Sequence, residues 1–275
     1  MSGSNEAPRT TFDGKSLSQC SALVTGSTGG IGEAMAARLA AAGCKVMLHG
    51  LLTAEAAEPR REALARETGA RVAYQRADLS SQAAVQGLVE ATLEAFGEID
   101  ILVNNAVARH FQPIVDFPPE QWEQALSVNL SAAFYAIRKL LPRMRAQNFG
   151  RIFNMTSVYG MRGTVDRVGY VTTKSALLGL TRAVALENLD FNVTCHSICP
   201  GSVLTPGTQA RVEELMAERR VDRSIAEREF LAGKQPSGSF VSPESVCDLL
   251  VFLCGPIGRD MTGAMIPVEA GWLAS

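Results

Sequence analysis

The chain has 275 residues, of which 47% are hydrophobic and 20% are charged, and its 26 Lys and Arg against 28 Asp and Glu leave a formal net charge of −2. That much apolar material is ample for a sizeable core at this length. General nucleic-acid binders and proteins of acidic membrane surfaces are normally basic, so the charge balance argues against both classes. We therefore expect a small-molecule substrate as the partner, with no nucleic acid and no membrane.

The N-terminal residues and the cysteines indicate the compartment. Residues 1–18 are rich in Ser, Gly, Asn and charges and hold no apolar run, so they predict a disordered extension rather than a secretory signal. No uncharged apolar run reaches the ~18 residues that a membrane helix needs. The six cysteines form no CxxC pair and mostly lie in apolar segments. They predict reduced core cysteines in a cytoplasmic protein, and no metal site.

The remaining chain, residues 19–275, alternates short apolar runs with longer helical patterns. The predicted elements are strand 20–25, helix 31–42, strand 45–49, helix 54–68, strand 72–77, helix 81–96, strand 99–104, helix 119–146, strand 151–156, helix 170–189, strand 192–198, helical insertion 206–232, helix 243–254 and strand 265–268. Strands that alternate with helices form βαβ units, and therefore a parallel sheet covered on both faces. The predicted fold class is α/β, a single doubly wound, Rossmann-like domain that binds ligands beyond the carboxyl ends of its strands.

A glycine-rich turn follows the first predicted strand. Residues 25–32 read TGSTGGIG, and a helical pattern begins within them. Glycines let the backbone approach a pyrophosphate, and a helix N-terminus offers free N–H groups and a positive dipole. In the first βα unit of such a chain, this turn predicts a dinucleotide phosphate site rather than a simple connection.

The end of the second predicted strand selects the dinucleotide. NAD enzymes commonly place an acid there for the ribose 2′-OH, and NADP enzymes an Arg for the 2′-phosphate. This sequence has neither, because residues 48–52 read LHGLL. An apolar rim cannot neutralise a phosphate dianion, so the pattern favours NAD. A protonated His49 could donate to a phosphate, but we interpret it as a histidine at the end of a strand.

A tyrosine and a lysine lie four residues apart at the start of a predicted helix. Tyr170 and Lys174 therefore share one helix face. A neighbouring ammonium group favours the phenolate form of a tyrosine, which is what a general acid and base for alcohol oxidation needs. Chance often produces this spacing, but Ser157 lies just past the fifth predicted strand and could hold a substrate oxygen.

Together these motifs resemble the short-chain dehydrogenase/reductase family over about residues 20–275. The resemblance rests on the TGxxxGxG spacing, on Asp78-Leu79 after the third strand, on Asn104-Asn105-Ala106 after the fourth, and on the stretch 200–205, although Val107 replaces a family glycine. It implies four catalytic residues, Asn129, Ser157, Tyr170 and Lys174, with Asn129 completing a proton relay to the lysine through a bound water. It implies NAD contacts from Gly26, Ser27, Thr28, Gly30, Ile31, Gly32, Asp78, Leu79, Asn105, Ala106, Tyr170, Lys174, Pro200, Gly201, Val203 and Thr205.

Several stretches are similar to one branch of that family, the bacterial 3-hydroxybutyrate dehydrogenases. They include residues 118–122, residues 180–187 and Gly271-Trp272. That branch holds the substrate carboxylate with two Gln, a His and a Lys. At the corresponding positions this chain has Arg109, Tyr159, Arg167 and, on the predicted lid, Arg211.

The three arginines predict an anionic substrate, because Arg binds carboxylate or sulfonate in a bidentate fork. The expected reaction is hydride transfer between NAD(H) and the carbinol or ketone carbon of a small hydroxy acid, either 3-hydroxybutyrate-like or a more highly charged hydroxy acid or sulfonate. The predicted substrate contacts are Arg109, Ser157, Tyr159, Arg167 and Arg211. Each arginine could instead point to solvent or pair with Asp116 or Asp166, and His110 is either a further polar contact or a loop histidine.

Other functions stay open at this stage. The same enzyme class could act on a neutral secondary alcohol, a sugar or another carbonyl compound, and a non-catalytic NAD-binding or sensing protein is the alternative from a different class. The insertion at residues 206–239 is long and highly charged, which predicts a helical lid over the substrate. The resemblance also implies a homotetramer, because family members usually pack their long helices and C-terminal segment between subunits.

Overall fold

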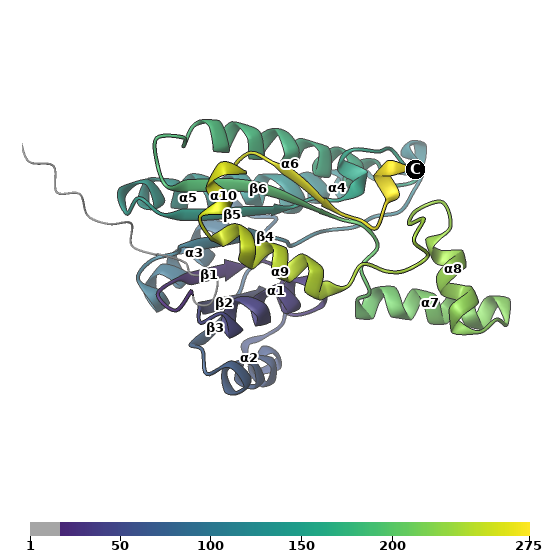
Figure 1. Cartoon of the computed structure of the whole chain (residues 1–275), viewed down its shortest axis with the longest axis horizontal. Coiled ribbons are helices and arrows are strands. Elements are labelled where there is room, and N and C mark those ends of the chain that lie inside the picture. Colours follow the sequence, from purple (N-terminus) through teal and green to yellow (C-terminus); the bar gives the residue numbers. More distant parts are fainter. Residues whose placement is uncertain (1–16) are drawn as a thin grey trace, which may run out of the picture.

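A computed structural model describes residues 17–275, which form one seven-stranded sheet in the order β3-β2-β1-β4-β5-β6-β7 (Figure 1). The strands are β1 Ser21–Val24, β2 Lys45–Gly50, β3 Val72–Arg76, β4 Ile101–Asn104, β5 Gly150–Met155, β6 Val193–Pro200 and β7 Met265–Val268. All neighbouring strands are parallel. The chain order reverses between β1 and β4, so a crevice is expected at their carboxyl ends. The predicted doubly wound, Rossmann-like fold is confirmed.

Helices cover both faces of this sheet. The helices of the described chain are α1 Gly30–Ala41, α2 Ala54–Thr68, α3 Gln82–Phe96, α4 Pro119–Leu126, α5 Ala132–Ala146, α6 Val168–Leu186, α7 Pro206–Arg219, α8 Arg223–Leu231, α9 Pro243–Cys254 and α10 Ile257–Asp260, of which α7 and α8 lie beyond the strand ends. Side chains alternate along each strand between two buried clusters. On β1, Ala22 and Val24 belong to the cluster under α1 and α9, and Leu23 belongs to the cluster under α3 and α5. This two-sided burial explains why the strands are continuous apolar runs.

The structure divides two of the predicted helical segments. The predicted helix 119–146 is α4 and α5, separated by the π-helical segment η2 Ser127–Ser131. The predicted insertion 206–232 is α7 and α8. The break between α7 and α8 lies at Arg220, whose φ is +54°, and Asp222 then caps α8 by accepting a hydrogen bond from the Ile225 N–H at 3.0 Å.

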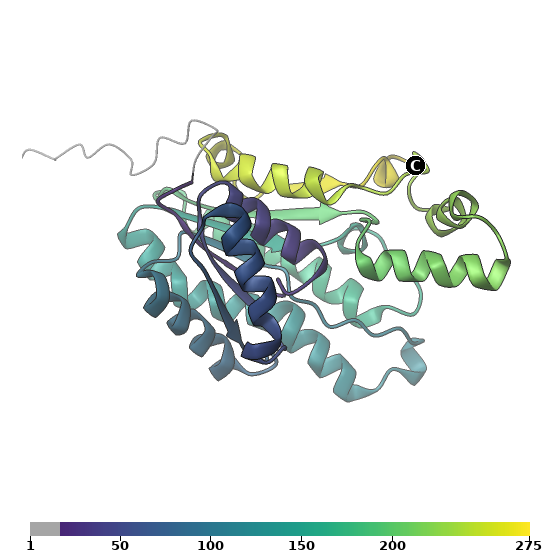
Figure 2. The same cartoon turned by 90° about the horizontal axis from the view of Figure 1, so that it is seen from below.

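The helices α7 and α8 project past the carboxyl ends of the strands (Figures 1 and 2). Val203 and Val241 pair as an isolated parallel bridge and so close the base of this insertion. Within it, Val212, Ala226 and Leu231 are buried. The insertion is therefore a packed substructure placed where a lid over the strand ends would lie.

The fold begins before residue 19. Leu17 is 1% exposed, and its N–H donates to the Ala42 carbonyl at 2.7 Å. Residues 1–16 lie outside the described residues, so the expected disorder of the N-terminal extension stays a prediction.

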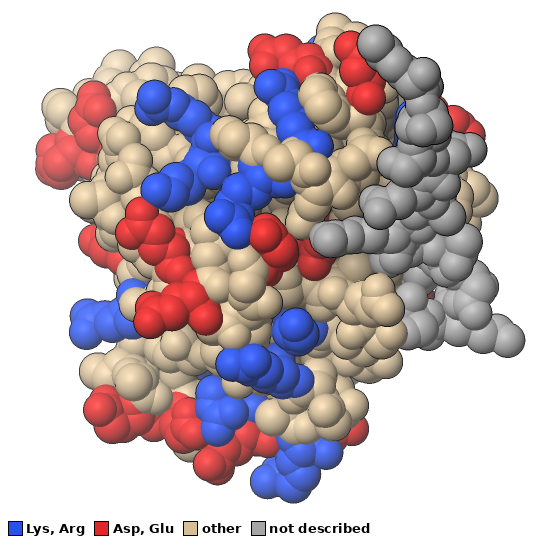
Figure 3. Space-filling model, turned by 90° about the vertical axis from the view of Figure 1, so that its left-hand side faces the viewer, with Lys and Arg blue, Asp and Glu red and all other residues tan. Residues whose placement is uncertain are grey.

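Figure 3 shows the end of the molecule away from α7 and α8, where basic and acidic side chains are interspersed. No described helix is long and apolar enough to cross a membrane.

Candidate active site

A cleft of about 990 Å³ opens at the carboxyl ends of the strands. Its walls come from the glycine turn after β1, the segments that follow β2 to β6, the insertion, and the C-terminal turn η4 Trp272–Ala274. Every predicted cofactor contact except Ser27, and every predicted substrate contact, lines this cleft. Of the predicted catalytic residues, Ser157, Tyr170 and Lys174 line it and Asn129 lies behind the wall.

The glycine turn has a backbone that only glycine suits. Gly26 and Gly30 have φ values of +63° and +59°. A Cβ atom at Gly32 would lie 2.2 Å from the Gly26 carbonyl oxygen, so a side chain there would displace the turn. At Gly29 and Gly30 nothing lies within 4 Å of the added Cβ position, so the turn is open at the N-terminus of α1. This arrangement suits a phosphate group.

The Ser27 side chain supports the turn from inside the protein. Its hydroxyl donates to the Val24 carbonyl at 2.7 Å and accepts from the His49 N–H at 2.9 Å. Ser27 is 1% exposed, so its side chain does not reach the cleft. The sequence pattern placed this residue among the cofactor contacts because a motif gives spacing and does not reveal the direction of a hydroxyl.

His49 supports the same turn. Its Nδ1 accepts a hydrogen bond from the Gly26 N–H at 3.0 Å, which leaves Nε2 as the donor to the Ala77 carbonyl at 3.0 Å. The ring is therefore neutral, and burial lowers the pKa of His49 below its ordinary value. This histidine joins the glycine turn to the end of β3, a role that its place in the sequence does not suggest.

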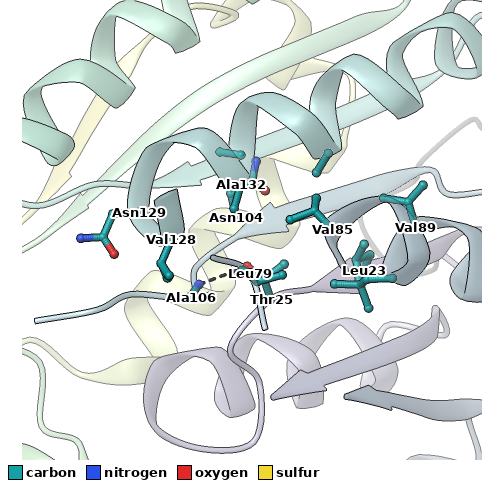
Figure 4. A pocket seen from close by; sticks show the side chains of 13 residues that line it. Leu23, Thr25, Leu79, Val85, Val89, Asn104, Ala106, Val128, Asn129 and Ala132 are labelled. Carbon is teal, nitrogen blue, oxygen red and sulfur yellow. Dashed lines mark hydrogen bonds between the residues drawn. The ribbon is translucent and has the colours of Figure 1, made fainter. Parts of the chain in front are cut away.

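Hydrogen bonds also join the glycine turn to the end of β4. The Thr25 hydroxyl accepts from the N–H groups of Asn105 and Ala106 at 2.9 and 3.1 Å, the second of which is dashed in Figure 4. The Asn105 amide donates to the carbonyls of Thr25 and Gly26 at 2.9 and 3.1 Å. Behind this junction lies a mostly apolar cavity of about 10 Å³, which is roughly the space of one water molecule.

Asn129 lies in the π-helical segment η2 and is buried (Figure 4). Its Oδ1 accepts from the Ala108 N–H at 2.7 Å, and its Nδ2 donates to the Ala108 carbonyl at 3.0 Å and to the Thr173 hydroxyl at 3.3 Å. The side chain thus fixes the segment that carries Arg109 against the helix that carries Lys174. Short π-helical segments often occur at functional sites.

The tyrosine and the lysine occupy one face of α6, as their spacing predicts. The Lys174 ammonium nitrogen lies 5.6 Å from the centre of the Tyr170 ring and donates to the Met155 carbonyl at 2.6 Å. Ser157 follows β5, and its hydroxyl accepts from the Tyr159 N–H at 3.2 Å. Burial, and then the charge of Arg109, lower the pKa of Lys174 to about 7.

Three arginines line the cleft near the rings of Tyr170 and Phe111. The Arg109 guanidinium lies over the Tyr170 ring, 5.5 Å from its centre. Arg167 lies 4.6 Å from the centre of the Phe111 ring, and Arg211 lies 5.9 Å from the same ring. All three line the cleft, where Arg109 and Arg211 are exposed and Arg167 is half-buried.

Lys234 is a fourth cation of this wall, and sequence reasoning did not find it. Its ammonium nitrogen lies 4.1 Å from the centre of the Phe230 ring, over which Arg211 also lies at 5.4 Å. Burial, and then the charges of Arg211 and Arg167, lower the pKa of Lys234. It follows α8 in the insertion, and the path of such a segment cannot be derived from local sequence patterns.

No acidic side chain neutralises these cations in the described part of the chain. The ion pairs there join other residues. The Asp166 backbone carbonyl accepts a hydrogen bond from the Gln112 N–H at 3.0 Å, and its side chain forms no ion pair with these cations. The pairing of an arginine with Asp116 or Asp166, which the sequence left open, does not occur.

His110 lines the cleft and bonds through Nε2 to the Gln124 side-chain oxygen at 2.9 Å.

Tyr159 and Trp272 lie side by side in the wall of the cleft. Their rings meet edge to face at 5.2 Å, and the Arg167 guanidinium lies 5.2 Å from the centre of the Tyr159 ring. Arg162 holds the C-terminal turn by donating to the Trp272 carbonyl at 2.9 Å. Among residues 17–275, no group of three or more His, Cys, Asp or Glu side chains is placed to hold a metal ion.

Comparison with known proteins agrees with this geometry. The family model described as short chain dehydrogenase matches residues 21–215. This chain belongs to the short-chain dehydrogenase family. It is 40% identical to a D-beta-hydroxybutyrate dehydrogenase of Cupriavidus necator over 92% of the chain and 97% of that enzyme. It is 34% identical to a protein of the same name from Rhizobium meliloti over 92% and 98% of the two chains.

A solved structure supports the fold of this short-chain dehydrogenase. L-sorbose reductase from Gluconobacter frateurii, described in complex with NADPH and L-sorbose, superimposes with a TM-score of 0.89. It is 28% identical and covers 95% of this chain and 99% of its own. The resemblance to the bacterial 3-hydroxybutyrate dehydrogenases, expected from the sequence, is confirmed.

A buried ammonium group in this short-chain dehydrogenase should cost stability at low pH. The folded pKa of Lys174, about 7, lies below its ordinary value of 10.5. The unfolded chain therefore binds more protons between these values, and stability rises with pH. We expect Lys174→Met to be more stable than the wild type at pH 6, with the difference in unfolding free energy shrinking by roughly 2–3 kcal/mol at pH 9.

Urea unfolding of both proteins at the two pH values measures this difference. The exposed Lys139, which pairs with Glu90 at 2.8 Å, provides the matched control, because Lys139→Met should give a difference that hardly depends on pH. A Lys174→Met difference that is equal at pH 6 and pH 9 would show that the buried lysine keeps its ordinary pKa.

Proposed function

We propose that this chain is an NAD-dependent dehydrogenase that transfers a hydride between NAD(H) and the carbinol or ketone carbon of a small anionic hydroxy acid. One observation carries the proposal: Ser157, Tyr170 and Lys174 line the same cleft as Arg109 and Arg167. A proton-transfer group thus lies beside cations suited to a carboxylate. The relatives named D-beta-hydroxybutyrate dehydrogenase support the same class of substrate.

The residues present fit a nicotinamide dinucleotide. The open turn at Gly29 and Gly30 leads into the N-terminus of α1, where a pyrophosphate would be held. Asp78 lies on the adenine side, and the segment from Pro200 to Thr205 lies where it would hold the nicotinamide amide. When bound, the nicotinamide supplies the hydride chemistry, and the protein supplies orientation and electrostatics.

The side chains of this chain handle the proton and the substrate. In the oxidation, the Tyr170 phenolate takes the hydroxyl proton while the Ser157 hydroxyl holds the substrate oxygen. A protonated Lys174 stabilises the phenolate. Asn129, which lies behind Tyr170 and Lys174, completes a proton relay to the lysine through a bound water. Arg109 and Arg167 bind the carboxylate. The ketone is reduced by the reverse steps.

NAD should be preferred over NADP by at least tenfold in kcat/KM. The rim at the end of β2 offers Gly50, Leu51 and Leu52, and both ring nitrogens of His49 are already bonded. An unpaired 2′-phosphate would cost at least a few kcal/mol. Steady-state kinetics with both dinucleotides measures the ratio. A ratio that favours NADP would contradict the proposal and would point to Thr28 as a missed phosphate contact.

The substrate class can be tested with a panel of racemic hydroxy acids, hydroxysulfonates, sugars and neutral secondary alcohols assayed with NAD. Acids should exceed their own methyl esters by at least tenfold in kcat/KM, because esterification removes the charge and keeps most of the shape. An ester that reacts as fast as its acid would favour the neutral-alcohol alternative. An absence of turnover across the whole panel would favour a non-catalytic NAD-binding protein.

We further infer a cytoplasmic homotetramer. The support for the compartment is that all six cysteines are free and buried. The support for assembly is that α5 exposes Phe134 and the C-terminal end of α6 exposes Leu186, at 46% and 70% of their surfaces. Such faces are commonly covered by another subunit.

A further inference from the structure

The substrate end of the cleft carries more positive charge than one carboxylate requires. Arg109, Arg167, Arg211 and Lys234 all line it, in addition to Lys174 beside Tyr170. Asp78 is the one acidic residue on the described walls, and it lies at the other end, after β3. A bidentate fork from a single arginine already satisfies a carboxylate.

These cations form a continuous row that runs from the reaction centre to the insertion. Arg109 lies over Tyr170, whose ring meets Tyr159 edge to face at 6.4 Å, and Arg167 lies over Tyr159. Arg167 and Arg211 then share the Phe111 ring. Arg211 and Lys234 share the Phe230 ring and are both contributed by the insertion.

In the described residues, the protein itself supplies no anionic partner to this row. Aromatic faces attract cations weakly, and they are the neighbours that the structure provides in place of carboxylates. In the described residues, the three guanidinium groups donate no hydrogen bond to a protein acceptor, and Lys234 donates only to the Phe230 carbonyl at 2.7 Å. Neighbouring like charges disfavour one another, and an anionic ligand relieves that repulsion.

We propose that the substrate carries a second anionic group, which Arg211 and Lys234 bind while Arg109 and Arg167 hold the first carboxylate. This inference rests on the proposed function and narrows it to hydroxy acids with two negative charges. The body of the protein supplies the first pair of cations and the insertion supplies the second pair. A ligand with a charge at each end therefore connects the insertion to the body, whereas a ligand with one charge leaves the second pair unpaired.

The chemistry of 3-hydroxybutyrate provides matched substrates for the test. Replacing its methyl group by a carboxylate gives malate, and replacing it by a carboxymethyl group gives 3-hydroxyglutarate. Both keep the carbinol and the first carboxylate unchanged. We expect kcat/KM for at least one of these dicarboxylates to exceed that for 3-hydroxybutyrate by tenfold or more at low ionic strength.

A second pair of compounds separates two sources of a double charge. In 2-hydroxypropylphosphonate both charges lie on one end group, and 2-hydroxypropylsulfonate has nearly the same shape with one charge. If the phosphonate exceeds the sulfonate tenfold and both dicarboxylates react no better than 3-hydroxybutyrate, the two charges belong on one group and the two-ended substrate is wrong.

Variants of the insertion assign the second anionic group to its residues. Lys234→Met and Arg211→Met should each lower the ratio of dicarboxylate to monocarboxylate kcat/KM by at least tenfold. Arg219→Met is the matched control, because Arg219 lies on α7 but does not line the cleft. It removes the same charge from the same helix and should leave the ratio unchanged. Equal losses in all three variants would assign the effect to net charge alone and overturn the proposal.

The outcomes separate this inference from the proposed function. If 3-hydroxybutyrate reacts as well as the dicarboxylates, the second anionic group is wrong and the hydroxy acid dehydrogenase stands. If no hydroxy acid of either charge reacts, both are wrong. Binding provides a readout without turnover: with NAD present, calorimetry should find that Tyr170→Phe binds succinate or glutarate at least tenfold more tightly than the monomethyl ester of the same acid. Equal affinity within both pairs would overturn the inference.

Discussion

Replacing Tyr170 with Phe should lower kcat by 10²- to 10⁴-fold, the range typical of a lost general acid or base. The change removes a hydroxyl group and keeps the ring over which Arg109 and Lys174 lie at 5.5 and 5.6 Å. Most of the residues that would hold the dinucleotide lie elsewhere, at the glycine turn and after β6, and the Tyr170 ring is kept. The Kd for NAD, measured by calorimetry, should therefore change less than threefold.

Tyr159 is the matched control for this prediction. Its ring lies 6.4 Å from that of Tyr170 and lines the same cleft, so Tyr159→Phe removes an equivalent hydroxyl from the same site. We expect it to retain more than a tenth of the wild-type kcat, because its role is contact and not proton transfer. If Tyr170→Phe also retained more than a tenth, the general acid and base would have to be another group.

Most of the fold could be predicted because its signals are local. Each strand of a doubly wound sheet is buried on both faces, so a short apolar run between helical patterns is a sufficient signal. Capping residues set several helix starts, as Ser81 does for α3, where its hydroxyl accepts from the Ala84 N–H at 3.4 Å. The division of the helix at η2 was not predictable, because a π-helical turn has no propensity signal of its own.

The candidate site, like the fold, could be predicted where its signals are local and not where they depend on tertiary structure. The spacing of Tyr170 and Lys174 on one helix, and the order of motifs after successive strands, are enough to predict that Ser157, Tyr170 and Lys174, three of the four proposed catalytic residues, lie in one cleft. The direction of the Ser27 hydroxyl and the presence of Lys234 in the cleft could not be predicted, because both depend on tertiary structure. The Ser27 hydroxyl turns inward to the backbone, and Lys234 reaches the cleft only through the path of α7 and α8.

Replacing Arg167 with Met should raise the KM for an acid substrate by about 30-fold, or roughly 2 kcal/mol, the low end for a truncated charge pair because the side chain is only half-buried. Arg167 lies between Phe111 and Tyr159 at 4.6 and 5.2 Å from their ring centres, so Met retains most of the packing and loses the charge. The Kd for NAD should stay unchanged.

Arg167→Lys separates charge from geometry: it keeps the charge without the fork, and its KM should fall between those of the wild type and Arg167→Met. An uncharged best substrate whose kcat/KM is the same in the wild type, Arg109→Met and Arg167→Met would contradict an anion-binding pocket and leave the neutral alcohol as the substrate class.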